Sequence, residues 1–178
     1  MVMLLFVAPL QADEYPELSK KDKLVAAYLF NFTKFIEWPD LSERDPRSEI
    51  VICLQANSEI LGFIKELVAS RRVGIKQLPV VVKVYQHQVR CDMVYVQRAD
   101  FFESTADSED GNQSGGLAHK NLQEVLIIAS NTDLYPDSAA ISFYEQKKRL
   151  RFEVNMNKIN SLKLKVRSEL LKLARIKQ

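Results

Sequence analysis

The segment from residue 149 to residue 176 constrains the fold of this chain more than any other stretch. In its first half apolar and polar side chains alternate strictly, which is typical of a β-strand with one buried side and one solvent-facing side. The apolar positions are Leu150, Phe152, Val154 and Met156. Its second half, Ser168 to Ile176, carries leucines at helical spacing behind a serine suited to an N-cap, and it predicts a closing helix.

The polar side of the alternating strand is formed by Arg149, Arg151, Glu153 and Asn155. This row has two interpretations, a binding surface or the solvated face of an edge strand. Half-exposed strands are common in sheets, so the residues alone favour the solvated face. Residue identity does not separate the two interpretations further.

Short apolar runs elsewhere in the chain predict the other strands, and an amphipathic run from Asn57 to Ser70 predicts a helix between the first two. The expected strands are Ile50–Leu54, Leu78–Tyr85, Met93–Val96, Val125–Ala129, Ala140–Glu145 and Arg149–Met156. Strands that are apolar on both faces belong in a sheet covered by helices. We therefore predict a single-domain α/β fold, a helix/sheet/helix sandwich with a largely parallel sheet and an antiparallel hairpin near the C-terminus.

The segment from Ser19 to Trp38 predicts a long amphipathic helix that Pro39 ends. Phe30 breaks the pattern because it falls on the polar side of this helix. We predict that Phe30 contacts a second subunit or another partner, since aromatic residues often anchor protein interfaces. The alternative is that a neighbouring element of the same chain, such as the C-terminal helix, covers it.

Two segments are expected to lie outside the packed domain. Residues 1–12 are apolar and end at Ala12, which suits a secretory signal peptide, with the usual basic start missing because a start codon is assigned late. The alternative is a frayed or packed N-terminal segment. Residues 103–116 have no apolar periodicity and many turn formers, and they predict a disordered surface loop within a single domain of residues 13–178.

The chain carries little that indicates catalysis, a metal or a cofactor. Cys53 and Cys91 are its only cysteines, and their spacing fits neither a zinc site nor a Cys-x-x-Cys redox pair. They form a disulfide if the chain is exported, or remain two buried thiols. The sequence lacks a phosphate-binding loop, a His-Glu-x-x-His motif and a nucleophile elbow. With basic residues scattered among acidic ones and a net charge of +2, we expect no enzyme, no cofactor, no metal and no nucleic-acid partner.

Three segments together resemble the YfiR family of periplasmic proteins. The first, LVAAYLFNFTKFIEWP, is similar to the family pattern Tyr-x-x-Asn-Phe-x-Lys-Phe-x-x-Trp-Pro, and the last, RLRFEVN, is similar to the family signature Arg-Phe-Glu-Ile/Val-Asn. The remaining segment lies between these two in the chain and combines IVICL with the later RCDMVYV. The matching residues are Tyr28, Asn31, Phe32, Lys34, Phe35, Trp38, Pro39, Arg151, Phe152, Glu153, Val154 and Asn155.

The resemblance implies an exported, periplasmic α/β domain with a Cys53–Cys91 disulfide, often dimeric. It implies a protein that binds the periplasmic part of a YfiN-type membrane diguanylate cyclase, or another membrane sensor, and represses cyclic-di-GMP synthesis. An alternative is a small-molecule-binding domain that feeds a sensor kinase or transport system. We assign six residues to the partner or ligand surface: Phe30, Asn31, Trp38, Arg151, Glu153 and Asn155. The chain departs from the family at Ser138-Ala139-Ala140, where members commonly carry glycines, and in the insertion-like loop 103–116.

Overall fold

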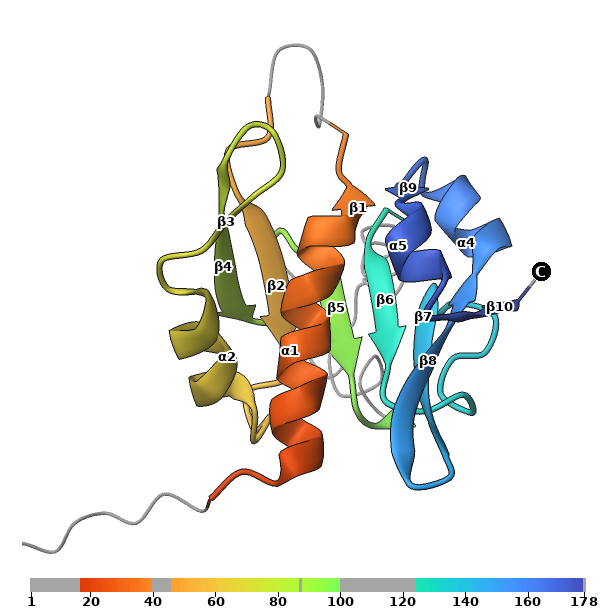
Figure 1. The fold of residues 1–178 in the computed structure, drawn as a ribbon. Coiled ribbons are helices and arrows are strands. Elements are labelled where there is room, and N and C mark those ends of the chain that lie inside the picture. The colour runs from red at the N-terminus through yellow and green to blue at the C-terminus, as the bar shows by residue number, and fades with distance from the viewer. Residues whose placement is uncertain (1–16, 40–45, 87, 100–123, 178) are drawn as a thin grey trace, which may run out of the picture.

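The computed structural model describes residues 17–39, 46–86, 88–99 and 124–177 (Figure 1). The helices of this part of the chain are α1 (Lys20–Phe35), α2 (Leu61–Val68), α4 (Met156–Ser161) and α5 (Ser168–Leu171). One large sheet contains β2 (Ile50–Leu54), β3 (Arg72–Val73), β4 (Leu78–Val84), β5 (Met93–Val96), β6 (Leu126–Ala129), β7 (Ile141–Gln146), β8 (Arg149–Asn155) and β10 (Arg175–Lys177). A separate ladder pairs β1 (Ile36–Glu37) with β9 (Lys165–Val166).

The large sheet has the strand order β10-β8-β7-β6-β5-β2-β4-β3. Its centre, from β4 to β7, is entirely parallel, and β8 pairs antiparallel with β7. The two-residue turn of this hairpin is Lys147-Lys148, and both residues have positive φ, as type I′ turns require. The predicted α/β class, the largely parallel sheet and the C-terminal antiparallel hairpin are therefore confirmed.

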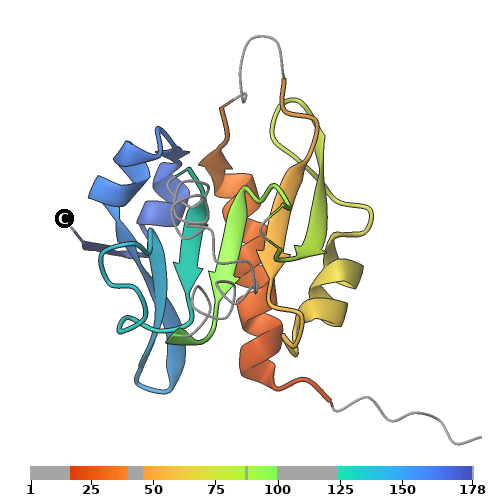
Figure 2. The same ribbon diagram turned by 180° about the vertical axis from the view of Figure 1, so that it is seen from behind.

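Alternation along the central strands divides the core between the two faces of the sheet. In β2 the side chains of Ile50, Ile52 and Leu54 pack on the face that α1 covers, while Val51 and Cys53 belong to a cluster on the opposite face. Both sets are fully buried, as continuous apolar runs in parallel strands require. Figure 2, from behind, shows that the described helices lie on one face of the sheet. A helical layer on the other face is not seen within the described residues.

An aromatic cluster fixes α1 against the C-terminal half of the sheet. Phe32 and Tyr28 of α1 meet Phe152 of β8 with ring centroids 5.2 Å and 5.4 Å apart, and Phe143 of β7 lies 6.1 Å from Phe32. Edge-to-face and offset ring pairs at these distances add to the stabilisation from area burial. The same cluster buries Tyr95 of β5, and burial raises the pKa of its hydroxyl.

The long N-terminal helix begins as the sequence predicts and ends earlier. Ser19 is its N-cap, and its hydroxyl accepts a hydrogen bond from the Asp22 amide at 3.1 Å. The helix ends at Phe35 rather than Trp38, because Ile36 pairs with Val166 across the β1–β9 ladder. The predicted helix from Asn57 to Ser70 is likewise shorter, with only Leu61–Val68 helical.

The C-terminal segment departs most from its prediction. The closing helix covers only Ser168–Leu171, Arg167 rather than Ser168 is its N-cap, and residues 175–177 form β10. Because β10 pairs in parallel with β8, β8 is not an edge strand and its polar row is not simply a solvated face. The predicted signal peptide (residues 1–12) and disordered loop (residues 103–116) lie outside the described residues.

Candidate functional site

A disulfide and a buried carboxylate join β2 to the segment just before β5. Cys53 of β2 is bonded to Cys91, with Cα atoms 5.8 Å apart, so the predicted pairing is present in the structure. The next residue, Asp92, is 5% exposed and accepts hydrogen bonds from the Val51 amide at 2.7 Å and from the buried guanidinium of Arg47. Arg47 also donates to the Pro39 carbonyl at 2.9 Å, so one ion pair ties the segment after β1 to β2 and β5.

The first three residues assigned to the partner surface lie near the end of α1, in different environments. Asn31 is half-buried and accepts a hydrogen bond from Lys34 Nζ at 3.1 Å. Trp38 is half-buried, with the Arg47 guanidinium 5.8 Å from its ring centroid. Phe30 is only 8% exposed within the single chain and belongs to the core. The chain itself therefore covers Phe30, which corrects the expectation of an exposed anchor.

Helix geometry shows on which side of α1 Phe30 lies. Residues two apart on a helix point about 200° apart, and Tyr28 points at Phe143 and Phe152. Phe30 therefore faces away from the C-terminal strands, toward the side of α1 against which α2 packs (Figure 1). The C-terminal helix suggested from the sequence is on the other side.

The other three assigned residues belong to β8 and have structural partners. Glu153 is 9% exposed and accepts hydrogen bonds from Arg175 of β10, including one from Nε at 2.9 Å. These bonds raise the pKa of the Arg175 guanidinium, which also lies 4.2 Å from the Tyr144 ring centroid. Asn155 is the N-cap of α4 and accepts from the Lys158 amide at 3.1 Å. Arg151 remains half-buried, with no structural role assigned to it.

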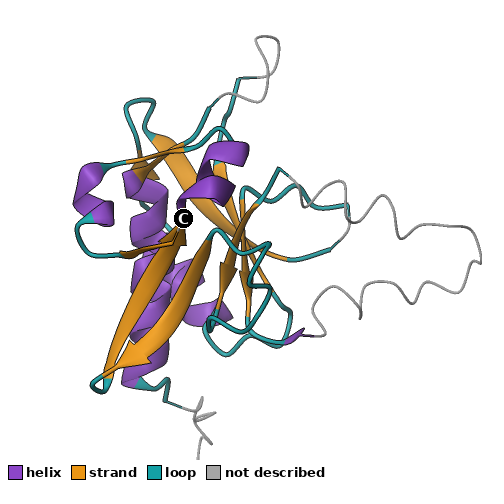
Figure 3. Cartoon of the chain, turned by 90° about the vertical axis from the view of Figure 1, so that its right-hand side faces the viewer, coloured by secondary structure: helices purple, strands orange, loops and turns teal. Residues whose placement is uncertain are grey.

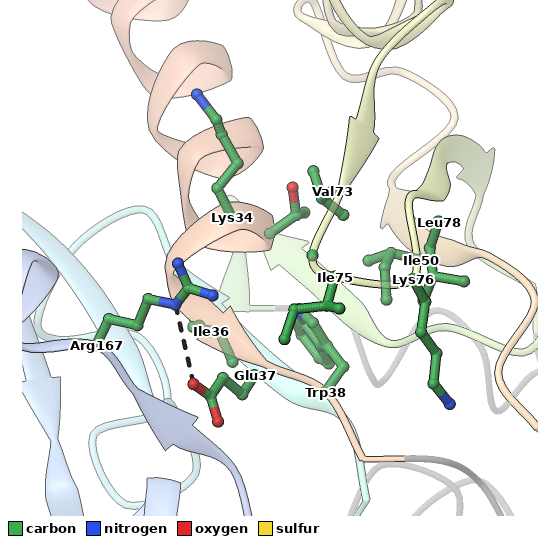
Figure 4. Close-up of a pocket in the computed structure, with 12 residues that line it drawn as sticks. Lys34, Ile36, Glu37, Trp38, Ile50, Val73, Ile75, Lys76, Leu78 and Arg167 are labelled. Atoms are coloured by element: carbon green, nitrogen blue, oxygen red, sulfur yellow. Dashed lines mark ion pairs between the residues drawn. The ribbon is translucent and has the colours of Figure 1, made fainter.

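A cavity of about 240 Å³ lies where the end of α1 meets the start of the sheet (Figure 4). Residues from α1, from β1 and the residue after it, from β2, from the β3–β4 hairpin and from the residue after β9 line it. The lining consists of Thr33, Lys34, Ile36, Glu37, Trp38, Ile50, Val73, Gly74, Ile75, Lys76, Leu78 and Arg167. Its position at the N-terminal ends of β2 and β4 differs from the C-terminal ends at which most open α/β sheets bind ligands.

The cavity combines an apolar floor with a mainly cationic rim. Lys34, Lys76 and Arg167 supply positive charge, and Glu37 supplies one carboxylate, 3.9 Å from Arg167 Nε. The indole nitrogen of Trp38 is buried and has no hydrogen-bond partner in the described part of the chain. Ile75, at the tip of the β3–β4 hairpin, is 94% exposed. This arrangement suits a small ligand with an apolar body and an acidic group, or a protein segment of the same chemistry.

Sequence reasoning found Trp38 but missed the residues that surround it. Arg167 joins the cavity because its amide donates to the Phe35 carbonyl at 2.9 Å beside the β1–β9 ladder. β1 and β9 are each only two residues long, which is too short to show the alternation of apolar and polar residues that predicts a strand. One member of the Arg47–Asp92 pair could have been noticed in the sequence. Asp92 is a charged residue placed directly before an apolar strand and next to a cysteine.

No group of three or more His, Cys, Asp or Glu side chains is placed to hold a metal ion in the part of the chain that the structure describes. Within the same ranges, none of the helices has the length and apolar character needed to cross a membrane.

The sequence of this chain matches the model of a known protein family. The sequence model of the YfiR/HmsC-like family matches residues 22–175, from the first turn of α1 to β10. The chain belongs to the YfiR/HmsC-like family. The match spans both motifs that carry the resemblance, and the β1–β9 ladder brings the end of one next to the segment that follows the other. A search of curated proteins finds no match.

A solved structure supports the fold. A conserved domain protein from Vibrio cholerae O1 biovar El Tor strain N16961 superposes with a TM-score of 0.50 at 9% identity. The alignment covers 86% of this chain and 60% of the other, so this chain spans about three fifths of that protein's length. At this identity the likeness concerns the fold alone.

Proposed function

We propose that this YfiR/HmsC-like protein is a periplasmic regulator that binds the periplasmic part of a membrane-bound diguanylate cyclase and represses cyclic-di-GMP synthesis. The observation that carries the proposal is the family match across residues 22–175. The Cys53–Cys91 disulfide supports an oxidising compartment, because such bonds persist in exported proteins and are rare in the cytosol. Self-association into a dimer is part of the proposal.

The cavity is the part of the described surface best suited to such a contact. Trp38 and Ile75 supply apolar area, and Lys34 with Arg167 supplies charge at the rim. Tryptophan and arginine are the residues that most often dominate binding energy at protein interfaces. Asn31 and Arg151 remain predictions as contact residues, whereas Glu153 and Asn155 are explained by their structural partners.

A second function has its own observation. The cavity of about 240 Å³, with the buried indole nitrogen of Trp38 in its wall, favours a small acidic ligand. The protein would then be a small-molecule-binding domain that feeds a sensor kinase or transport system.

Crosslinking in intact cells separates the two functions. A photo-crosslinker placed at the exposed Ile75 is expected to capture a membrane-bound diguanylate cyclase. The matched control places the crosslinker at exposed Gly62 in α2, where an added side chain meets nothing within 4 Å, and is expected to capture none.

A thermal-shift screen of periplasmic metabolites supplies the complementary measurement, since a ligand at a hundred times its Kd stabilises the folded state by about 2.7 kcal/mol. A ligand that raises Tm in the wild type but not in Trp38→Ala, together with no captured cyclase, would replace the first function by the second. Capture of the cyclase at both positions alike would remove the cavity from the interface.

A further inference from the structure

Basic residues are concentrated in one C-terminal segment rather than scattered as the whole-chain composition suggests. Residues 156–177 contain seven lysines and arginines and one acidic residue, Glu169, for a net charge of +6. Since the whole chain has a net charge of +2, the remaining residues carry −4. The basic residues are Lys158, Lys163, Lys165, Arg167, Lys172, Arg175 and Lys177.

The fold gathers this segment at one edge of the large sheet. It contains α4, β9, α5 and the edge strand β10, which lie together on the right-hand side of Figure 1, the side that faces the viewer in Figure 3. Lys163, Lys165, Lys172 and Lys177 are exposed. Within the described residues none of these four lysines forms an ion pair, while Arg167 and Arg175 pair with Glu37 and Glu153.

Two exposed aliphatic residues belong to the same segment as these lysines. Leu173 is 60% exposed and Ile176 is 44% exposed, and they are two of the four large hydrophobic residues exposed in the described ranges. We call the set of Lys163, Lys165, Lys172, Lys177, Leu173 and Ile176 the basic edge. Exposed lysines around exposed aliphatic side chains are the composition with which peripheral proteins bind a membrane surface.

We propose that the basic edge binds a surface of anionic phospholipid headgroups. The proposal rests on the proposed function, which places the protein beside a membrane-bound partner. A lysine ammonium is a compact, strongly hydrated point charge on a flexible stem, so it attracts headgroup phosphates without requiring the fixed bidentate geometry of an arginine. All four unpaired cations of the basic edge are lysines, and its two arginine neighbours are already engaged with carboxylates.

Protection of the edge strand does not account for the whole set. Charged side chains on an edge strand prevent edge-to-edge pairing of sheets, and Lys177 of β10 fits that role. Lys163 and Lys172 lie in turns outside any strand, and Lys165 belongs to the two-residue β9 rather than to β10. Leu173, in the turn before β10, has no protective role there, since an exposed leucine promotes association.

The test measures binding of the purified protein to vesicles. Vesicles with roughly one third phosphatidylglycerol in phosphatidylcholine are expected to bind it at about 0.1 M salt and to release it at about 0.5 M, because salt screens exposed charges. Pure phosphatidylcholine vesicles are expected not to bind. The variant Lys163→Gln/Lys172→Gln/Lys177→Gln is expected to weaken binding on the order of a hundredfold, given about 1 kcal/mol per basic residue.

Two further variants complete the design. Lys20→Gln/Lys65→Gln/Arg71→Gln removes the same charge from exposed positions in α1, in α2 and beyond α2, and it is expected to bind like the wild type. Leu173→Ser/Ile176→Ser keeps the charge and is expected to weaken binding about tenfold through lost apolar burial. Urea midpoints equal to that of the wild type confirm that each variant is folded.

Three outcomes overturn the proposal. The wild type does not bind anionic vesicles, or the control triple variant loses as much vesicle binding as the variant of the basic edge. In the third outcome, the lysines of the basic edge are needed only for binding to the isolated periplasmic domain of the partner. The last result would assign the surface to an acidic protein. A wild type that lowers cellular cyclic-di-GMP but does not bind vesicles contradicts only the lipid proposal. A wild type that binds vesicles but leaves cyclic-di-GMP unchanged contradicts only the proposed function.

Discussion

Replacing Asp92 by Asn is expected to lower the free energy of unfolding by about 3–5 kcal/mol, the usual effect of removing one member of a buried ion pair. The side chains of Arg47 and Asp92 are 7% and 3% exposed, so the variant removes the carboxylate charge that faces a buried guanidinium. Asn retains an acceptor for the Val51 amide, but its NH2 group cannot accept from Arg47, so the charge and the Arg47 hydrogen bond are lost together. Urea unfolding followed by circular dichroism measures the change.

The matched control is Glu49→Gln at a more exposed pair. Glu49 accepts a hydrogen bond from Lys83 Nζ at 2.9 Å, and the two side chains are 33% and 42% exposed. Pairs of this kind contribute about 1 kcal/mol or less, so the control is expected to lose little. A loss below about 1 kcal/mol for Asp92→Asn would show that the ion pair does not hold the starts of β2 and β5 together.

Reduction of the Cys53–Cys91 disulfide is expected to cost roughly 4 kcal/mol, the chain-entropy value for a sequence separation of 38 residues. The bond joins β2 to the residue two before β5, so reduction frees the unfolded chain more than it alters the native packing. Urea midpoints with and without a reductant measure the effect. The variant Cys53→Ala/Cys91→Ala serves as the control, and its midpoint is expected not to change with reductant. An unchanged wild-type midpoint would contradict the stabilising role.

The sequence was sufficient to predict the elements whose side chains enter the core. The bounds of β2 and β5 match the predicted Ile50–Leu54 and Met93–Val96, because fully buried strands show themselves as continuous apolar runs. The Cys53–Cys91 disulfide, which the resemblance implied and the residues alone left open, forms between β2 and the segment before β5, which lie side by side. The start of α1 followed from its N-cap, Ser19.

The sequence was misleading where tertiary pairing overrides local preference. The leucine spacing after Ser168 predicts a helix to Ile176, yet residues 175–177 join the sheet. A physical reason is Glu153, which β8 buries and which needs the cation that Arg175 supplies from β10. The Ser168–Leu171 helix is too short to form by itself, so packing decides where it ends.

Phe30 shows why the candidate site could be predicted only in part. A helical wheel places Phe30 among polar residues, but it does not show that α2 packs against that side of α1. The cavity is equally hidden from the sequence, since Trp38, Ile75 and Arg167 are far apart in the chain and meet through two-residue strands. Asn155 stood out in the motif for a structural reason, the capping of α4.

Repression of a membrane-bound diguanylate cyclase by this YfiR/HmsC-like protein is the proposed function. The measurement that tests it most directly is the cellular concentration of cyclic-di-GMP in a strain that lacks the gene, in its parent and in the strain complemented with the wild-type gene. We expect the cyclic-di-GMP concentration to rise on deletion and to return to the parental concentration on complementation. Equal concentrations in all three strains under several growth conditions would contradict it.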